Sequence, residues 1–411
     1  MFIKNIRIIN PINNEDFISN IFIEGNLIKY IGDDCFSHEK YIDGSGLIIG
    51  PSFFDPHVHF RDFNESDKET FESGSLAAIK GGYTHVVTMA NTKPAMDNLD
   101  MLNLAKEKIK NLPIDILLTC NITQNMEGKT CVNFKELYEN GARGFTDDGK
   151  PILDPEIMIK ALEVSKIYDT PISLHEENPD FIKYSGYNET APREAEIDII
   201  NRDINLLKEY GGSIHVQHLT SKEGVQIIRE AKAENLKITT EVTPNHLFYT
   251  EEDVEKYGTL LKINPPIRTE ADKNALIDGL FDGTIDMIGT DHAPHTEANK
   301  SMGKYESMSG IISLETCYSM VQMVLSRDTR FSYNHLFKIM SLNPAKLYGI
   351  KKDVSVGNIA DLVIIDPNYS YKYLTTNSKS KNTPLLGSEL KGKVLMTIKS
   401  GEVVYSDMKG R

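Results

Sequence analysis

The chain of 411 residues carries 59 acidic against 45 basic side chains, which gives a formal net charge of −14. A nucleic-acid binder normally shows a basic surplus, so this balance argues against that class of protein. With 40% hydrophobic and 25% charged residues, the composition excludes a disordered or fibrous chain and is typical of a globular protein.

The sequence shows no sign of a secretion signal or a membrane span. Its N-terminal stretch MFIKNIRIINPINNEDF has charged or amide residues every few positions, and no apolar run approaches the roughly 20 residues that cross a bilayer. The four cysteines are scattered without a C-x-x-C pair, which argues against a disulfide framework or a thiolate metal site. We therefore expect a cytoplasmic protein with reduced thiols and no membrane partner.

The first 50 residues alternate apolar and polar side chains in the manner of short antiparallel strands. FIKNIRII and SNIFIEGNLIKYIG show this alternation, and Gly25-Asn26 stands where a hairpin turn is needed. A segment of this length cannot bury a core by itself. Residues 1–50 are therefore expected to combine with another part of the chain.

Residues 51–350 consist of short apolar runs that alternate with helix-compatible segments. Eight runs have the composition of buried strands: 52–60, 84–90, 114–123, 142–148, 171–177, 213–220, 237–243 and 285–293. Helices are expected over 98–111, 154–168, 221–235 and 271–281. Asp154 before Pro155, and Ser221, are typical helix starts. Eight β/α units favour an α/β fold of the closed (β/α)8 TIM type over two unrelated α/β halves.

Residues 351–411 return to the strand pattern of the N-terminal segment. VGNIADLVIID and KVLMTIKSGEVVYS have the alternation of strands, and residues 367–386 between them are predicted to be irregular. Because neither end can bury a core alone, residues 1–50 and 351–411 are predicted to form one small β-sandwich domain beside the barrel.

Side chains that bind metals stand where the predicted barrel strands end, which is where barrels of this type carry their reactive groups. His57 and His59 are two residues apart, so both face the barrel interior on an extended strand. Further strand ends carry Asp147-Asp148, His175, His218 and Asp291-His292. A single buried histidine is more often a core residue, but this combination favours a metal site.

The candidate ligands offer nitrogen and oxygen without thiolate, which suits Zn²⁺, with Mn²⁺, Co²⁺ or Ni²⁺ chemically possible. They exceed the needs of one tetrahedral ion, so we expect two divalent ions that share a carboxylate and a hydroxide. Such a site carries roughly one positive charge and attracts an anionic substrate. Asp291 can bind a metal through one oxygen and act as general base with the other.

Arg61 lies two residues beyond His59 and projects to the same side of the predicted strand. A guanidinium there would bind a substrate carboxylate through two hydrogen bonds. The alternative is a surface arginine that pairs with Asp62 or Glu65. His215 has no matching partner in the pattern, and packing or support of a ligand is the simpler interpretation.

The motifs as a set resemble the amidohydrolase superfamily and, more closely, the dihydroorotases of the long bacterial type, which act in pyrimidine biosynthesis. The resemblance rests on DPHVHFR, FTDDG, HVQHLTS, EVTPNHL, KINPPIR and GTDHAPH, among others, between about residues 50 and 350. An aspartate stands where the related dihydropyrimidinases and allantoinases usually carry a carboxylated lysine. Departures from the family pattern include Ser52, which replaces a usual glycine, and Ser309, which replaces a usual aromatic residue.

The resemblance implies a role for each candidate residue. The implied metal ligands are His57, His59 and Asp291 on one ion, His175 and His218 on the other, and Asp148 as the bridge. Asp148 is preferred to Asp147 because it matches the second aspartate of the family motif. The implied substrate contacts are Arg61, Asn91 and His295 at the carboxylate, and Asn264, Ser309 and Gly310 at the ring amides.

The implied reaction is the reversible closure of N-carbamoyl-L-aspartate to (S)-dihydroorotate, with a metal-bridging hydroxide as nucleophile for hydrolysis and Asp291 as general acid and base. Two alternatives stay open: another cyclic amide hydrolase, similar to hydantoinases or allantoinases, or a non-catalytic dihydroorotase-like subunit of an aspartate transcarbamoylase complex. The resemblance also leaves a homodimer and an association with aspartate transcarbamoylase open.

Overall fold

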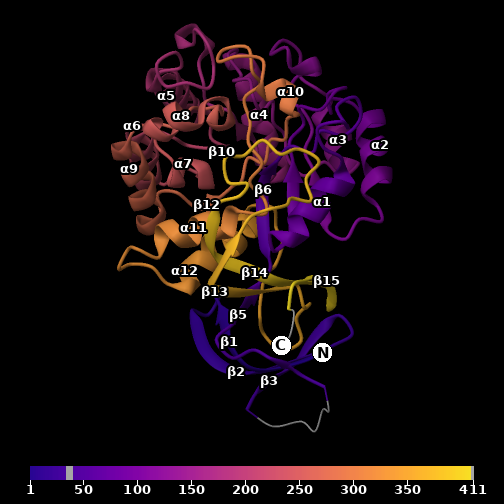
Figure 1. Ribbon diagram of the computed structural model, residues 1–411. Helices are drawn as coiled ribbons and strands as arrows, with labels where there is room; N and C mark the ends of the chain where they lie inside the picture. Colours follow the sequence, from indigo (N-terminus) through magenta and orange to yellow (C-terminus); the bar gives the residue numbers. More distant parts are fainter. Residues whose placement is uncertain (34–39, 409–411) are drawn as a thin grey trace.

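The computed structural model describes residues 1–33 and 40–408. Figure 1 shows a large α/β body and, at one end of it, a smaller sheet to which the strands near both chain ends belong. Among the described residues no helix is long and apolar enough to cross a membrane. Cys120 and Cys317 are buried and unpaired, whereas Cys131 is partly exposed and Cys35 lies outside the described residues.

The large body is a (β/α)8 barrel. Two arcs of parallel strands make up its wall: β6 (Phe53–Val58), β7 (Tyr83–Thr88) and β8 (Asp115–Leu118), then β9 (Ser173–Leu174), β10 (Ile214–Val216), β11 (Ile238–Val242) and β12 (Met287–Ile288). Bridges from Phe145 to Cys120 and to Ile172 join the arcs on one side, and a bridge from Val58 to His292 closes the ring on the other.

The fourth unit differs from its prediction, because the run 142–148 is not an extended strand. No continuous strand forms there, and the run has isolated bridges from Phe145 to Cys120 and to Ile172. The Asp147 carboxylate accepts hydrogen bonds from the backbone N–H groups of Ile122 and Thr123, at 2.9 and 3.2 Å. Backbone hydrogen bonds nevertheless continue the barrel wall through this run, because the Phe145 N–H donates to the Pro171 carbonyl at 3.0 Å and the Thr146 N–H donates to the Cys120 carbonyl at 2.9 Å.

Helices surround the ring. The four expected segments are helical, as α2 (Leu99–Ile109), α4 (Pro155–Tyr168), α6 (Lys222–Ala233) and α9 (Glu270–Asp282). Asp154 is the N-cap of α4, and Ser221 is the N-cap of α6. The longer helices are α1 (Phe71–Lys80), α2 (Leu99–Ile109), α4 (Pro155–Tyr168), α5 (Arg193–Tyr210), α6 (Lys222–Ala233), α9 (Glu270–Asp282) and α11 (Cys317–Leu325). The shorter ones are α3 (Phe134–Glu139), α7 (Pro244–Phe248), α8 (Glu251–Tyr257), α10 (Glu297–Lys300), α12 (Tyr333–Phe337) and α13 (Asn343–Leu347). Further short turns are η1 (Gln124–Met126), η2 (Pro179–Phe181), η3 (Gly258–Leu261) and η4 (Lys338–Leu342).

The smaller sheet takes its strands from both ends of the sequence, in the order β15-β14-β13-β5-β1-β2-β3, with β4 beside β1. Its strands are β1 (Phe2–Asn10), β2 (Glu15–Glu24), β3 (Leu27–Gly32), β4 (Ile42–Asp43), β5 (Ile48–Pro51), β13 (Leu362–Lys372), β14 (Glu389–Lys399) and β15 (Glu402–Ser406). Gly25, with a φ of 58°, lies in the predicted turn between β2 and β3. β13 continues to Lys372, so the first part of the predicted irregular segment 367–386 is strand, paired with β14.

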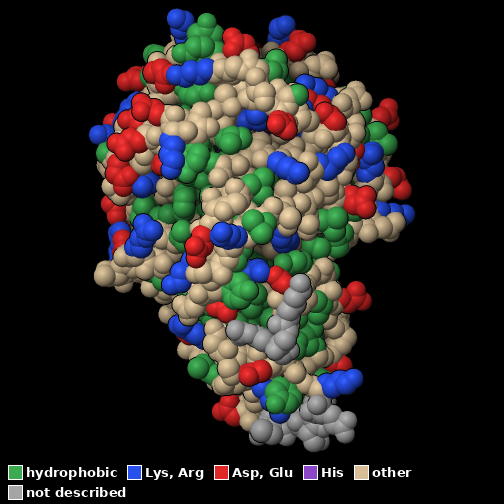
Figure 2. All heavy atoms as spheres, viewed as in Figure 1, with side chains coloured by type: hydrophobic (Ala, Val, Ile, Leu, Met, Phe, Trp, Pro, Cys, Tyr) green, Lys and Arg blue, Asp and Glu red, His purple; other side chains and the backbone are tan. Residues whose placement is uncertain are grey.

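Alternate side chains of this sheet belong to different cores. Ile48 and Val363 pack in the large hydrophobic cluster of the barrel and its helices, whereas their neighbours Ile49 and Ile364 pack in a separate cluster on the other face. This alternation is what a pleated strand produces. The sheet is thereby attached to the amino-terminal end of the barrel, and the opposite end remains accessible. On the face drawn in Figure 2, Lys and Arg side chains are interspersed with Asp and Glu.

Candidate metal centre

The first predicted pair of ligands lies at the carboxyl end of β6. His57 Nε2 is 3.2 Å from His59 Nε2, and His59 Nε2 is 2.9 Å from Asp291 Oδ1. Asp148 Oδ2 lies 3.7 Å from His57 Nε2 and 3.3 Å from His59 Nε2. Side chains that are far apart in sequence therefore surround one point at the barrel mouth.

The second predicted pair lies on the other side of Asp148. His175 Nδ1 is 2.9 Å from His218 Nε2. Asp148 Oδ1 lies 3.7 Å from His175 Nδ1 and 3.5 Å from His218 Nε2. One oxygen of Asp148 thus faces each histidine pair, whereas Asp147 turns away to bind the backbone of residues 122–123.

This donor set fits divalent metal ions. In each pair two imidazole nitrogens point at each other, an arrangement that one cation between them satisfies better than one shared proton. Asp148 Oδ1 and His218 Nδ1 are buried without a hydrogen-bond partner in the described part of the chain. Burial acts to raise the pKa of Asp148, but His57, His175 and His218 hold that pKa well below its usual value, so the carboxylate is ionised.

The backbone at two of these residues is strained. His218 and Asp291 have φ values of 34° and 45°, in the left-handed region that non-glycine residues rarely adopt. Such strain occurs where a functional side chain must be aimed. Asp55 helps to hold the strand ends, since its Oδ1 accepts hydrogen bonds from His57 N at 3.1 Å and Thr290 N at 3.0 Å.

Glu241 is a supporting residue that the sequence interpretation missed. Its carboxylate, fully buried, lies 2.6 Å from His57 Nδ1 and 3.2 Å from His215 Nε2. It therefore fixes the ring orientation of His57, and His215 supports it in turn. The available signal was a glutamate inside the buried strand KITTEVT, because a buried charge requires a partner. Gly289 leaves room for it, since a Cβ there would lie 2.3 Å from Glu241 Oε2.

A pocket of about 440 Å³ opens beside the cluster. All the predicted substrate contacts line it: Arg61, Asn91, Asn264, His295, Ser309 and Gly310. Arg61 Nε, Asn264 Oδ1 and His295 Nδ1 are buried without a partner in the described structure. Asn91 also supports the centre itself, with Oδ1 3.0 Å from His59 Nδ1 and Nδ2 3.2 Å from Asp148 Oδ2.

The alternative interpretation of Arg61, as a surface arginine that pairs with Asp62 or Glu65, is wrong. Asp62 pairs with Lys108, and Glu65 pairs with Lys68 and Lys93, whereas Arg61 forms no ion pair with either acid in the described residues. Burial lowers the pKa of Arg61 from its usual value. Its guanidinium is held in the pocket wall, where a carboxylate ligand would satisfy it.

Comparisons with known proteins identify what this arrangement is similar to. A family model for the amidohydrolase family matches residues 48–404. The dihydroorotases of Clostridioides difficile and Aquifex aeolicus are each 39% identical to the chain; the alignments cover 99% of it and 100% and 99% of those proteins, respectively. Among solved structures, the L-hydantoinase (dihydropyrimidinase) from Arthrobacter aurescens has a TM-score of 0.89 at 25% identity, covering 98% of this chain and 96% of its own.

Proposed function

The chain belongs to the amidohydrolase family, and we propose that within this family it is a dihydroorotase that interconverts N-carbamoyl-L-aspartate and (S)-dihydroorotate. The observation that carries the proposal is the meeting of the histidine–aspartate cluster with a pocket of unpartnered donors and acceptors. A cationic centre beside a buried guanidinium suits a small cyclic amide that carries a carboxylate.

Two divalent ions, with Zn²⁺ as the first choice, would be held by the two histidine pairs and the two aspartates. His57, His59 and Asp291 would hold one ion, and His175 and His218 the other, with Asp148 shared. When bound, such ions polarise an amide carbonyl and make an attacking water more acidic.

Asp291 is placed to move the proton. Its Oδ1 lies against His59 at 2.9 Å, while Oδ2 forms no hydrogen bond in the described structure. In hydrolysis Oδ2 takes a proton from the attacking water and passes it to the leaving ring nitrogen. In ring closure Asp291 starts protonated, so closure gains at low pH and hydrolysis at high pH.

Arg61, Asn91 and His295 hold the substrate carboxylate in the pocket that all three line. The planar guanidinium offers two parallel N–H groups, which match the two oxygens of a carboxylate. His295 Nε2 is 2.9 Å from the Ser309 carbonyl oxygen, which leaves Nδ1 free for the ligand. This recognition distinguishes the proposal from a hydantoinase-like amidase, which requires no substrate carboxylate.

The decisive experiment is an activity assay with dihydroorotate before chelation, after chelation and after metal restoration. We expect activity that chelation abolishes and Zn²⁺ restores, with about two metal equivalents in the purified protein. Activity on hydantoins but not on dihydroorotate would favour the cyclic amidase alternative. A protein without metal and without activity would favour the alternative of a non-catalytic subunit. The presence of all the candidate ligands counts against that alternative.

A further inference from the structure

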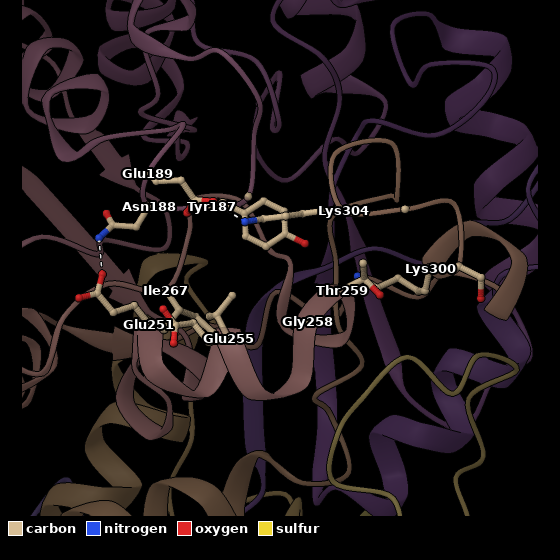
Figure 3. A pocket seen from close by; sticks show the side chains of 14 residues that line it. Tyr187, Asn188, Glu189, Glu251, Glu255, Gly258, Thr259, Ile267, Lys300 and Lys304 are labelled. Carbon is tan, nitrogen blue, oxygen red and sulfur yellow. Dashed lines mark hydrogen bonds and ion pairs between the residues drawn. The ribbon is translucent and has the colours of Figure 1, made fainter.

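The loop of residues 301–310, here called the partition loop, separates two cavities. Residues 305–310 line the substrate pocket. Ser301, Gly303 and Lys304 line an outer cavity of about 780 Å³, whose other walls include residues 186–189 and α8 (Figure 3). Residues 305–310 of the partition loop therefore form one wall of the substrate pocket, and contacts that hold these residues shape the pocket.

Lys262, on the segment that leads to Asn264, holds the middle of the partition loop. Its side chain is only 2% exposed. The ammonium group donates to the Tyr305 carbonyl at 2.8 Å and to the Ser307 carbonyl at 2.7 Å. Lys262 forms no ion pair in the described structure, although buried cations normally require a partner. Carbonyl dipoles of the loop therefore serve as its counter-charge.

Lys300, at the end of α10, holds the last part of the same loop. It is 4% exposed, and its ammonium group donates to the Met308 and Gly310 carbonyls, both at 2.9 Å. It too forms no ion pair among the described residues. Two buried lysines thus bind four carbonyls between Tyr305 and Gly310. Lys262 lines the substrate pocket, whereas Lys300 lines the outer cavity.

The direction of these carbonyls determines where the N–H groups point. In a planar trans peptide the C=O and the following N–H point in opposite directions. The Met308 carbonyl faces Lys300, so the Ser309 N–H points away from Lys300 and toward the pocket that Ser309 lines. The neighbouring Gly310 N–H is already bonded to the Lys262 carbonyl, whereas the Ser309 N–H has no partner within the described residues.

We propose that Lys300 is a positioning residue, assisted by Lys262, that presents the Ser309 N–H to the substrate as a hydrogen-bond donor for a carbonyl oxygen of the cyclic amide. This inference rests on the proposed function and deepens it. The contact uses the backbone, so it does not depend on the aromatic side chain that Ser309 replaces. Because the amide carbonyl is present throughout the reaction, the bond stabilises ground state and transition state alike.

Lys304 provides a matched control within the same loop. Its side chain is 54% exposed, pairs with Glu189 at 2.6 Å and lies 4.8 Å from the centre of the Tyr187 ring (Figure 3). It therefore contacts side chains of the outer cavity, whereas Lys300 binds the loop backbone. A Lys304→Met variant removes an equal charge from the loop without releasing a carbonyl.

The kinetic test compares Lys300→Met with Lys304→Met. We expect Lys300→Met to raise KM for dihydroorotate about tenfold with kcat within about twofold of wild type, as loss of one uniformly made hydrogen bond predicts. Lys300→Arg should restore most of the affinity, and Lys304→Met should leave KM within about twofold. Ser309→Pro, which removes the donor itself, should reproduce the KM rise even where Lys300→Met fails to fold.

Hydrogen–deuterium exchange of the holoenzyme supplies a readout that does not require activity. Residues 305–310 should exchange about tenfold faster in Lys300→Met than in wild type or Lys304→Met. Wild-type KM and wild-type exchange in Lys300→Met would overturn the inference, as would equal effects of the two lysine variants. A wild-type protein inactive on dihydroorotate would refute the proposed function instead, while the exchange data would still decide whether Lys300 holds the loop.

Discussion

Two polar clusters, one buried and one partly exposed, lie at opposite ends of the barrel strands. The metal centre occupies the carboxyl ends, and a second group, here called the basal cluster, occupies the amino ends beside the smaller sheet. The basal cluster consists of His85, Asp115, Lys352, Asp361 and Lys399. Both clusters combine histidine with charged side chains, yet they differ in whether their polar atoms have partners.

The basal cluster is internally satisfied. Lys352 Nζ donates to Ser52 Oγ at 2.8 Å, and His85 Nε2 lies 3.0 Å from Asp115 Oδ2. Lys399 lies 2.6 Å from Asp115 and thereby ties the smaller sheet to the barrel. The bond to Lys352 also gives Ser52 a role at a position where the family usually has glycine.

The metal centre, by contrast, leaves buried atoms of Asp148 and His218 without partners, and Arg61 and Asn264 nearby as well. Buried polar atoms are nearly always hydrogen-bonded in proteins, so a group of exceptions in one place indicates a ligand. Partner-free atoms distinguish the candidate metal centre and its pocket from the basal cluster, whose charged side chains all have partners. Variants at the two ends should therefore affect different properties.

The largest effect is expected for Asp291→Asn. The amide keeps a metal-binding oxygen but cannot accept the proton, so turnover of dihydroorotate should fall about a hundredfold to ten-thousandfold. Metal content, measured by elemental analysis, should change much less. Near-full activity of this variant would contradict the assignment of Asp291 as the proton carrier.

Arg61→Lys should give the next largest effect. Lysine keeps the charge but loses the planar pair of donors, which costs about 2 kcal/mol, or roughly a thirtyfold fall in kcat/KM for dihydroorotate. Any residual activity on a neutral hydantoin, which lacks the carboxylate, serves as the control and should not change. An equal loss on both substrates would show that Arg61 does not bind the carboxylate.

Glu241→Gln tests the support behind His57. Loss of the carboxylate should lower metal affinity about tenfold to a hundredfold, which competition with a chelator measures. Glu65→Gln, at the rim of the substrate pocket and in contact with lysines, is the control and should keep wild-type affinity. Unaltered metal retention in Glu241→Gln would mean that His57 is oriented by other contacts.

Asp115→Asn probes the basal cluster and should change stability, not activity. Burial acts to raise the pKa of Asp115, but His85 and Lys399 outweigh it and hold that pKa below the usual value. The stabilisation is therefore present above about pH 4 and is lost as the pH falls further. Denaturant unfolding should show a deficit of about 1 kcal/mol at pH 7 that shrinks toward pH 3. A deficit independent of pH would point to packing instead.

Local patterns were enough to locate the proposed ligands. The spacing of His57 and His59 places both on one face of a strand, and the ends of later strands supplied His175, His218 and Asp291. Glu241 and Lys300 could not be identified in the same way. Their importance comes from contacts with His57 and with the Met308 carbonyl, and neither contact follows from a periodic pattern in the chain.

The sequence by itself determined the alternation of strands and helices, the helix caps at Asp154 and Ser221, and the chemistry of the barrel mouth, because these depend on side-chain type and short-range spacing. Only the tertiary structure decided which atoms are left without partners, that Glu241 supports His57, and that buried lysines hold the partition loop. Those outcomes depend on where distant segments meet, and therefore on the packing of the whole barrel.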